Sequence, residues 1–77
     1  MRIMYINNNG GGFADFINVD ENMTIEKLFK HKMPHEESRD YLIRVNRQPV
    51  PQDYVLKEND RVTITPTKIE GAKIVLA

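Results

Sequence analysis

Two runs of alternating residues, separated by a connector rich in turn formers, constrain this chain more than any other feature. The runs cover Tyr41–Val45 and Arg61–Thr65. Their larger apolar side chains recur at every second position: Tyr41, Ile43 and Val45, then Val62 and Ile64. Because successive side chains of a strand point to opposite faces, both runs predict strands with one buried face. They favour a sheet that is covered on one side only.

The connector contains turn formers at both of its ends. Asn46 follows the first run and Asn59 precedes the second, and asparagine tolerates the left-handed backbone conformation better than most residues. Prolines flank Val50 on both sides and cannot donate ladder hydrogen bonds, so any strand pairing at Val50 is expected at a sheet edge. Leu56 is predicted to anchor the connector to the core.

The N-terminal part of the chain predicts a β-hairpin. Strand candidates cover Arg2–Ile6 and Phe13–Val19, with Ile17 and Val19 on one face of the second, and the segment 7–12 between them reads Asn-Asn-Asn-Gly-Gly-Gly. A glycine-rich loop can also hold phosphate through its backbone amides. Here strand residues follow the loop, and no Lys-Ser/Thr pair does, so we interpret the loop as the hairpin tip.

One helix is predicted, from Thr24 to Met33. Thr24 suits the N-cap position, and Pro34 ends the helix. The buried face is predicted from helical spacing to consist of Ile25, Leu28, Phe29 and Met33.

The opposite face of this helix is basic. It carries Lys27, Lys30 and His31, with Lys32 at its end. Lys27 and Lys30 are therefore candidate contacts for an acidic protein partner. The alternative is a solvated helix face whose charge is compensated by Glu26 and Glu36.

Together these elements predict an α+β domain in which a mixed sheet of four to five strands packs on one helix. The expected order is strand, strand, helix, strand, short edge segment and strand. The first and last strands are expected to be parallel neighbours at the centre. We predict one domain over residues 1–67 and a tail over residues 68–77.

The connector resembles the second half of ubiquitin-like β-grasp domains. The residues that carry the resemblance are Val45-Asn46, Val50-Pro51, Asp53-Tyr54, Leu56-Lys57 and Asn59-Asp60-Arg61-Val62. They are most similar to the sulfur carriers ThiS and MoaD, and more distantly to TGS domains of RNA-linked proteins. The chain departs from the carriers at Arg47 and Asn59, where that family prefers glycine. The resemblance implies a ubiquitin-like β-grasp fold and leaves the function open.

The tail bears on that function. Sulfur carriers end in Gly-Gly, which an ATP-dependent activating enzyme adenylates in a narrow cleft. The matching residues here are Gly71 and Ala72, and five more residues follow. Three explanations remain: removal of the extension, a binding module that lost the carrier role, or an extra strand or partner contact formed by Ile74–Leu76.

Composition narrows the function classes. Eleven basic and eleven acidic residues cancel, and the chain has no cysteine. We therefore expect no disulfide and no thiolate catalysis, and nucleic-acid binding is disfavoured. His31 and His35 are separated by Pro34, which breaks the helical geometry of a metal pair, so neither a metal nor another cofactor is predicted. No apolar run is long enough to span a bilayer, and we expect a cytoplasmic protein.

We find no nucleophile–base pair with supporting spacing, and we do not expect an enzyme. The first functional hypothesis is a protein-binding module whose contacts include Leu42 and Arg44 on the exposed sheet face. The second is a sulfur carrier that acts through a processed C-terminus, with an activating enzyme as a possible partner. A TGS-like domain that contacts RNA is the weakest hypothesis.

Overall fold

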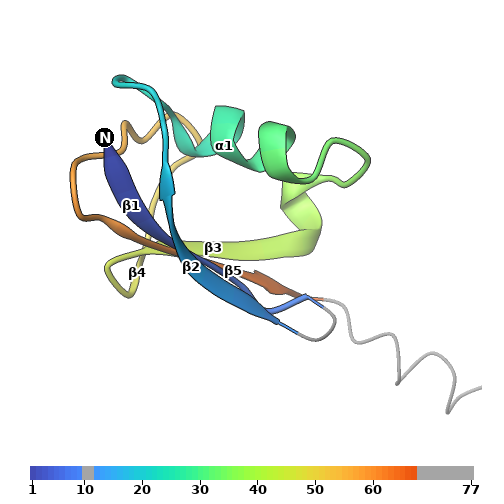
Figure 1. Ribbon diagram of the computed structural model, residues 1–77. Coiled ribbons are helices and arrows are strands. Elements are labelled where there is room, and N and C mark those ends of the chain that lie inside the picture. The colour runs from blue at the N-terminus through green and yellow to red at the C-terminus, as the bar shows by residue number, and fades with distance from the viewer. Residues whose placement is uncertain (10–11, 68–77) are drawn as a thin grey trace, which may run out of the picture.

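Within the described residues, 1–9 and 12–67, five strands form one mixed sheet and a single α-helix lies across one of its faces (Figure 1). The elements in chain order are β1 (Arg2–Asn7), β2 (Phe13–Asn18), α1 (Ile25–Lys32), a 3-10 turn η1 (Ser38–Asp40), β3 (Tyr41–Val45), β4 (Gln48–Pro49) and β5 (Arg61–Pro66). The predicted α+β fold class is confirmed. The short turn η1 was not predicted and lies in the polar segment between the helix and β3.

The strand order in the sheet is β2-β1-β5-β3-β4. β1 and β5 run parallel at the centre, as predicted, and the remaining neighbours are antiparallel. In the β3–β5 ladder Val45 lies opposite Val62 and Ile43 lies opposite Ile64. The apolar positions of the two organising runs therefore share one face of the sheet, which is the face that α1 covers.

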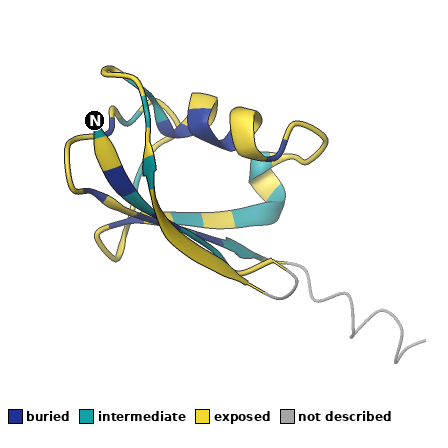
Figure 2. Cartoon of the chain, viewed as in Figure 1, coloured by how far each residue is buried: buried dark blue, intermediate teal, exposed yellow. Residues whose placement is uncertain are grey.

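The core lies between this face and the helix. Its buried side chains come from α1, its C-cap, the connector and the strands β1, β3 and β5, and they are Ile3, Tyr5, Ile25, Leu28, Phe29, Met33, Val45, Leu56, Val62 and Ile64. The four residues predicted for the buried face of the helix are all among them, and so is Leu56. Ile17 and Val19 pack against the core at its margin. Figure 2 shows the alternation of buried and exposed positions along the strands.

The connector holds the first turn of α1. The backbone N–H groups of a first helical turn have no partner within the helix. Here the N–H of Ile25 donates to the carbonyl of Tyr54 at 3.0 Å, and the N–H of Glu26 donates to the carbonyl of Gln52 at 2.9 Å. Thr24 is the N-cap, as predicted, and its hydroxyl accepts the N–H of Lys27 at 3.2 Å. The helix start is thereby fixed on the connector.

Asp60 fixes the other end of the connector. It is the buried acidic residue of the described chain, with 6% of its surface exposed. Its carboxylate accepts hydrogen bonds from the Asn46 amide at 3.0 Å, the Tyr54 hydroxyl at 3.0 Å and the backbone N–H of Lys57 at 2.9 Å. A buried carboxylate needs such donors to replace its hydration. The sequence predicted only a turn at this position.

The turn after β3 is tighter than the sequence suggested. Asn46 and Arg47 both have positive φ, 52° and 73°, as in the two-residue turns that suit hairpins. Gln48 therefore pairs with Val45 directly after the turn, and the edge strand covers Gln48–Pro49. The pairing was expected, if anywhere, at Val50, which instead packs against the core.

Candidate protein-binding surface

The face of the sheet that α1 does not cover is the first candidate surface, and we call it the open face. Leu42 and Arg44 of β3 point to it, because the neighbouring positions of this strand point toward the helix. Leu42 is 37% exposed and Arg44 is exposed. The structure thus brings these two predicted contact residues together on one accessible surface.

Apolar and basic side chains dominate the strand positions of the open face. Alternation along the strands places there Arg2, Met4, Ile6, Ala14, Phe16, Asn18, Leu42, Arg44, Pro49, Arg61, Thr63 and Thr65. These positions include three arginines and no carboxylate. The open-face strand positions therefore carry positive charge, although the whole chain has a formal net charge of zero.

Phe16 and Arg2 extend this surface toward β2, and neither was predicted as a contact residue. Phe16 is 50% exposed, and the guanidinium carbon of Arg2 lies 4.5 Å from the centre of its ring. Phe16 lies directly opposite Met4 in the β1–β2 ladder. The alternation in β2 was the available signal, since Phe16 has the opposite parity to Ile17, which was predicted to face the core.

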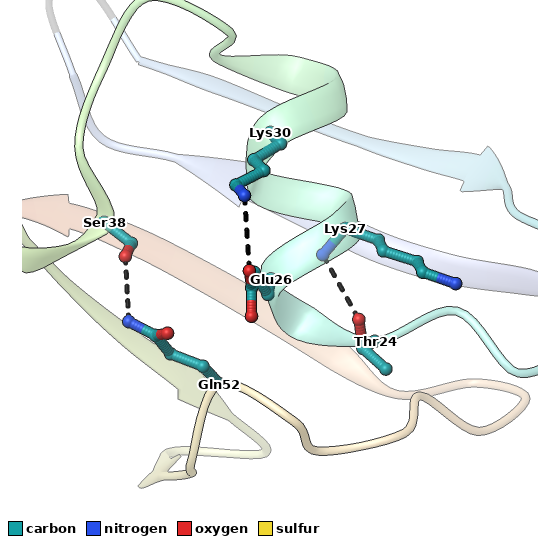
Figure 3. A network of polar contacts seen from close by, with 6 residues as sticks. All are labelled: Thr24, Glu26, Lys27, Lys30, Ser38 and Gln52. Carbon is teal, nitrogen blue, oxygen red and sulfur yellow. Dashed lines mark hydrogen bonds and ion pairs between the residues drawn. The ribbon is translucent and has the colours of Figure 1, made fainter.

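Lys27 and Lys30 lie on the other side of the molecule, on the exposed surface of α1 (Figure 3). The ammonium group of Lys30 forms an ion pair with Glu26 at 3.3 Å, one helical turn away. Such exposed pairs contribute little to stability, but this one compensates the charge of Lys30, as the solvated-face interpretation expected. The structure does not bring the two lysines together with Leu42 and Arg44.

A cavity of about 350 Å³ lies beside Lys30. Its lining comes from α1, the segment before η1, η1 itself and the connector: Glu26, Phe29, Lys30, Glu36, Glu37, Ser38 and Gln52. Two of these lining residues are hydrogen-bonded, since the Gln52 amide donates to the Ser38 hydroxyl at 2.9 Å (Figure 3). Glu37 forms its own ion pair with Arg39 at 3.1 Å. Two pairs of lining residues, Glu26–Lys30 and Ser38–Gln52, thus interact with each other.

Two tyrosines have raised pKa values. Burial raises the pKa of Tyr54 above its usual value of 10.0, and the hydrogen bond to Asp60 and the negative charge of that carboxylate raise it further. Burial also raises the pKa of Tyr5, against a smaller opposite effect of its hydrogen bond from the Asn7 amide. Both perturbations come from packing in and around the core, and neither tyrosine is paired with a nucleophile.

Two further structural facts concern the described residues alone. They contain no group of three or more His, Cys, Asp or Glu side chains arranged to hold a metal ion. No helix among them is long and apolar enough to cross a membrane. Gly71, Ala72 and the segment Ile74–Leu76 lie outside the described residues, so the predictions for the tail stay predictions.

One solved structure with a similar fold is a ubiquitin-like protein from the hyperthermophilic archaeon Caldiarchaeum subterraneum. The match covers 90% of this chain and 99% of that one, with a TM-score of 0.67 and 13% sequence identity. This chain has a ubiquitin-like β-grasp fold. At this identity the likeness concerns the fold alone.

The sequence matches no protein-family model and no curated protein. The expected ubiquitin-like fold is confirmed by the sheet topology and by the structural likeness. The closer resemblance to ThiS and MoaD remains a prediction from the connector motif.

Proposed function

We propose that this β-grasp domain is a non-catalytic protein-binding module that engages its partner through the open face. The observation that supports this proposal most directly is the combination of exposed apolar side chains with Arg2, Arg44 and Arg61 at strand positions that hold no carboxylate. A partner surface with apolar residues inside an acidic rim would complement it.

Leu42 and Arg44 have the roles expected of central contacts in such an interface. An exposed leucine loses its contact with water when the partner covers it, and arginine can form two parallel hydrogen bonds with a carboxylate. Few interface residues contribute most of the binding energy, and arginine is frequent among them. Because both side chains point away from the core, replacing them should leave the fold intact.

The test compares variants on the two sides of the molecule. A partner captured from the host is titrated against wild type, Leu42→Ala, Arg44→Glu and Lys27→Ala by calorimetry. We expect Leu42→Ala and Arg44→Glu each to weaken binding by about tenfold or more, which corresponds to roughly 1.4 kcal/mol. Lys27→Ala should change the affinity less than about twofold, because it lies on α1.

Two outcomes would contradict the open-face assignment. If Lys27→Ala weakens binding while Leu42→Ala does not, the basic helix face is the contact surface. If Leu42→Ala lowers the melting temperature by many degrees, then Leu42 contributes to packing, and its effect on binding is indirect.

The alternative function is a sulfur carrier whose tail is processed near Gly71 and Ala72 and activated by an ATP-dependent enzyme. It is supported by the β-grasp fold together with the connector motif. The intact mass of the protein from its own host separates the two functions. A mass that includes the tail favours the binding module. A mass that corresponds to a chain ending near Gly71, with one carboxylate oxygen replaced by sulfur, favours the carrier.

A further inference from the structure

The cavity beside Lys30 takes no part in the proposed function. It has a volume of about 350 Å³ and lies between α1, the segment before η1 and the connector. This volume is near the lower end of the range for ligand pockets, which is about 300–1,000 Å³. Phe29 is the one apolar residue among its described lining residues, and it is 2% exposed. The cavity therefore suits a small polar ligand rather than an apolar one.

The ion pairs in and beside the lining leave one carboxylate without a counter-charge. Glu26 is paired with Lys30 at 3.3 Å, and Glu37 is paired with Arg39 at 3.1 Å. Among the described residues, Glu36 forms no ion pair. A hollow with walls of one charge concentrates ions of the opposite charge. The lining thus matches a ligand that carries a single positive charge.

The hydrogen-bonding groups that remain available in the lining are mainly acceptors. Gln52 uses its amide nitrogen to donate to Ser38, so its amide oxygen can still accept. In Figure 3 this oxygen points to the side on which Glu26 lies. A carboxylate has about four acceptor positions, and the carboxylates of Glu26 and Glu36 come from α1 and from the segment before η1. Because these acceptors belong to three separate parts of the chain, a ligand must present several donors in different directions.

We propose that this cavity binds a guanidinium group, carried either by an arginine side chain of a peptide or by a free small molecule. A guanidinium has one positive charge and five N–H donors in a planar fork, so it can donate to Glu36 and to the Gln52 oxygen at once. An ammonium has the same charge, but it is a compact and strongly hydrated group with three donors. The site lies on the α1 side of the molecule and does not depend on the proposed function of the open face.

The test titrates the full chain, labelled with ¹⁵N, with small probes and follows the backbone amide signals by NMR at low salt. The probes are the Nα-acetyl methylamides of arginine, of lysine and of citrulline, which is the neutral isostere of arginine. We expect the arginine probe to bind at least about fivefold more tightly than the citrulline probe, because only arginine forms charge-assisted hydrogen bonds. The lysine probe should fall between them, and the amide signals of Glu36, Ser38 and Gln52 should shift most.

A fourth probe separates the two sources of the guanidinium group. N-acetylagmatine has the same charge and side chain as the arginine probe but lacks its second peptide group. Tighter binding of the arginine probe would assign the site to a peptide arginine. Equal or tighter binding of N-acetylagmatine would assign it to a free small molecule. Both results support guanidinium binding.

Four variants test the roles of the lining charges. Glu36→Gln should weaken binding of the arginine probe by about threefold or more. Its matched control is Glu21→Gln, an exposed carboxylate in the loop before α1, which should change the affinity less than about twofold. Lys30→Met should strengthen binding severalfold, because it frees Glu26 for the ligand. Lys27→Met removes the same charge from α1 outside the cavity lining and is its control.

Several outcomes would overturn the proposal. These are the absence of shifts at about 50 mM arginine probe, far above a millimolar dissociation constant, or equal binding of the arginine and citrulline probes. Tighter binding of the lysine probe would make the site one for ammonium groups. Equal weakening by Glu36→Gln and Glu21→Gln would show general charge attraction without a site. Unchanged binding of the arginine probe by Leu42→Ala would support a site separate from the open face, whether or not that face binds a protein.

Discussion

At the scale of single residues, the departures from the glycine pattern of the sulfur carriers have measurable consequences. Arg47 has a φ of 73° and Asn59 has a φ of 70°. Residues other than glycine are strained at these φ values, because their Cβ atom meets the backbone, and asparagine is strained less than arginine. Both turns therefore have a left-handed residue that is not glycine, and Arg47 should cost more stability than Asn59.

We accordingly expect Arg47→Gly to stabilise the domain. Relief of about 1–2 kcal/mol of left-handed strain, less the roughly 0.5–1 kcal/mol that the greater freedom of glycine in the unfolded chain costs, should raise the free energy of unfolding by about 0.5–1 kcal/mol. The melting temperature should rise by roughly 2–8 °C for a domain of this size. Thermal unfolding followed by circular dichroism measures this. Asn59→Gly is the matched control and should give a smaller gain. A lower melting temperature for Arg47→Gly would show that its side chain makes contacts that outweigh the strain.

Because of Tyr54, the stability of the fold should decrease at alkaline pH. Its pKa in the folded state is raised above the usual 10.0, first by burial and then by Asp60. A tyrosine with a raised folded pKa contributes stability that is fully present below its unfolded pKa. That contribution is lost as the pH rises through the folded pKa. The loss should therefore begin above about pH 10.

Tyr54→Phe tests this pH dependence. At neutral pH the variant should be less stable by about 1 kcal/mol, because the hydrogen bond to Asp60 is lost. Between about pH 9 and 11.5 its melting temperature should fall less than that of wild type. Tyr5, whose pKa is also raised by burial, is present in both proteins and contributes equally to both curves. Parallel curves would contradict a role for Tyr54 in the alkaline loss.

At the scale of elements, α1 places residues that are adjacent in the sequence on opposite sides, one buried and one exposed to solvent. Phe29 is 2% exposed, and its ring centre lies 5.3 Å from that of Tyr41 in β3. Lys30, the next residue, is exposed and paired with Glu26. The same short segment thus supplies the largest fully buried side chain of the core and a part of the solvated helix face.

Phe29→Ala should therefore lower the free energy of unfolding by about 3–5 kcal/mol, through lost burial and the cavity left behind. For a small domain this is a large share of the total stability. Chemical denaturation with urea measures it, and Lys30→Ala is the control, expected to stay within about 0.5 kcal/mol of wild type. A Phe29→Ala variant with an unchanged midpoint would be inconsistent with the packing of α1 on the sheet.

At the scale of the whole molecule, the sheet connects distant parts of the chain into one cooperative unit. β1 and β5 pair at its centre although they come from opposite ends of the domain, and the connector caps the helix that precedes it. Stability therefore depends on closing long loops, as expected for a mixed sheet with non-local pairing.

The predicted boundary between residues 1–67 and 68–77 can be tested at this scale. A chain truncated after Thr67 keeps every buried residue of the described core, so its melting temperature should agree with that of the full chain within about 2 °C. Differential scanning calorimetry of both chains measures this. A clearly lower value for the truncated chain would place part of the tail within the folded domain.

Local patterns in the sequence predicted the main strands, the helix and their buried faces, but neither the turn η1 nor the position of the edge strand at Gln48–Pro49. Alternation in the two organising runs, helical spacing after Thr24 and turn residues such as Asn46 are local signals, because strand and helix geometry impose them on neighbouring residues. Together with the connector motif and the handedness of crossover connections, these signals predicted the β-grasp topology and the burial of Phe29 and Leu56.

Which residues lie on the same surface of the molecule depends on the tertiary structure. Leu42 and Lys27 lie on opposite sides of the molecule, Asp60 is buried among donors, and β2 is left as an exposed edge. None of these facts has a local signature in the sequence. Each depends on which strands pair across long separations, and that depends on the packing of the whole core rather than on the period of any one segment.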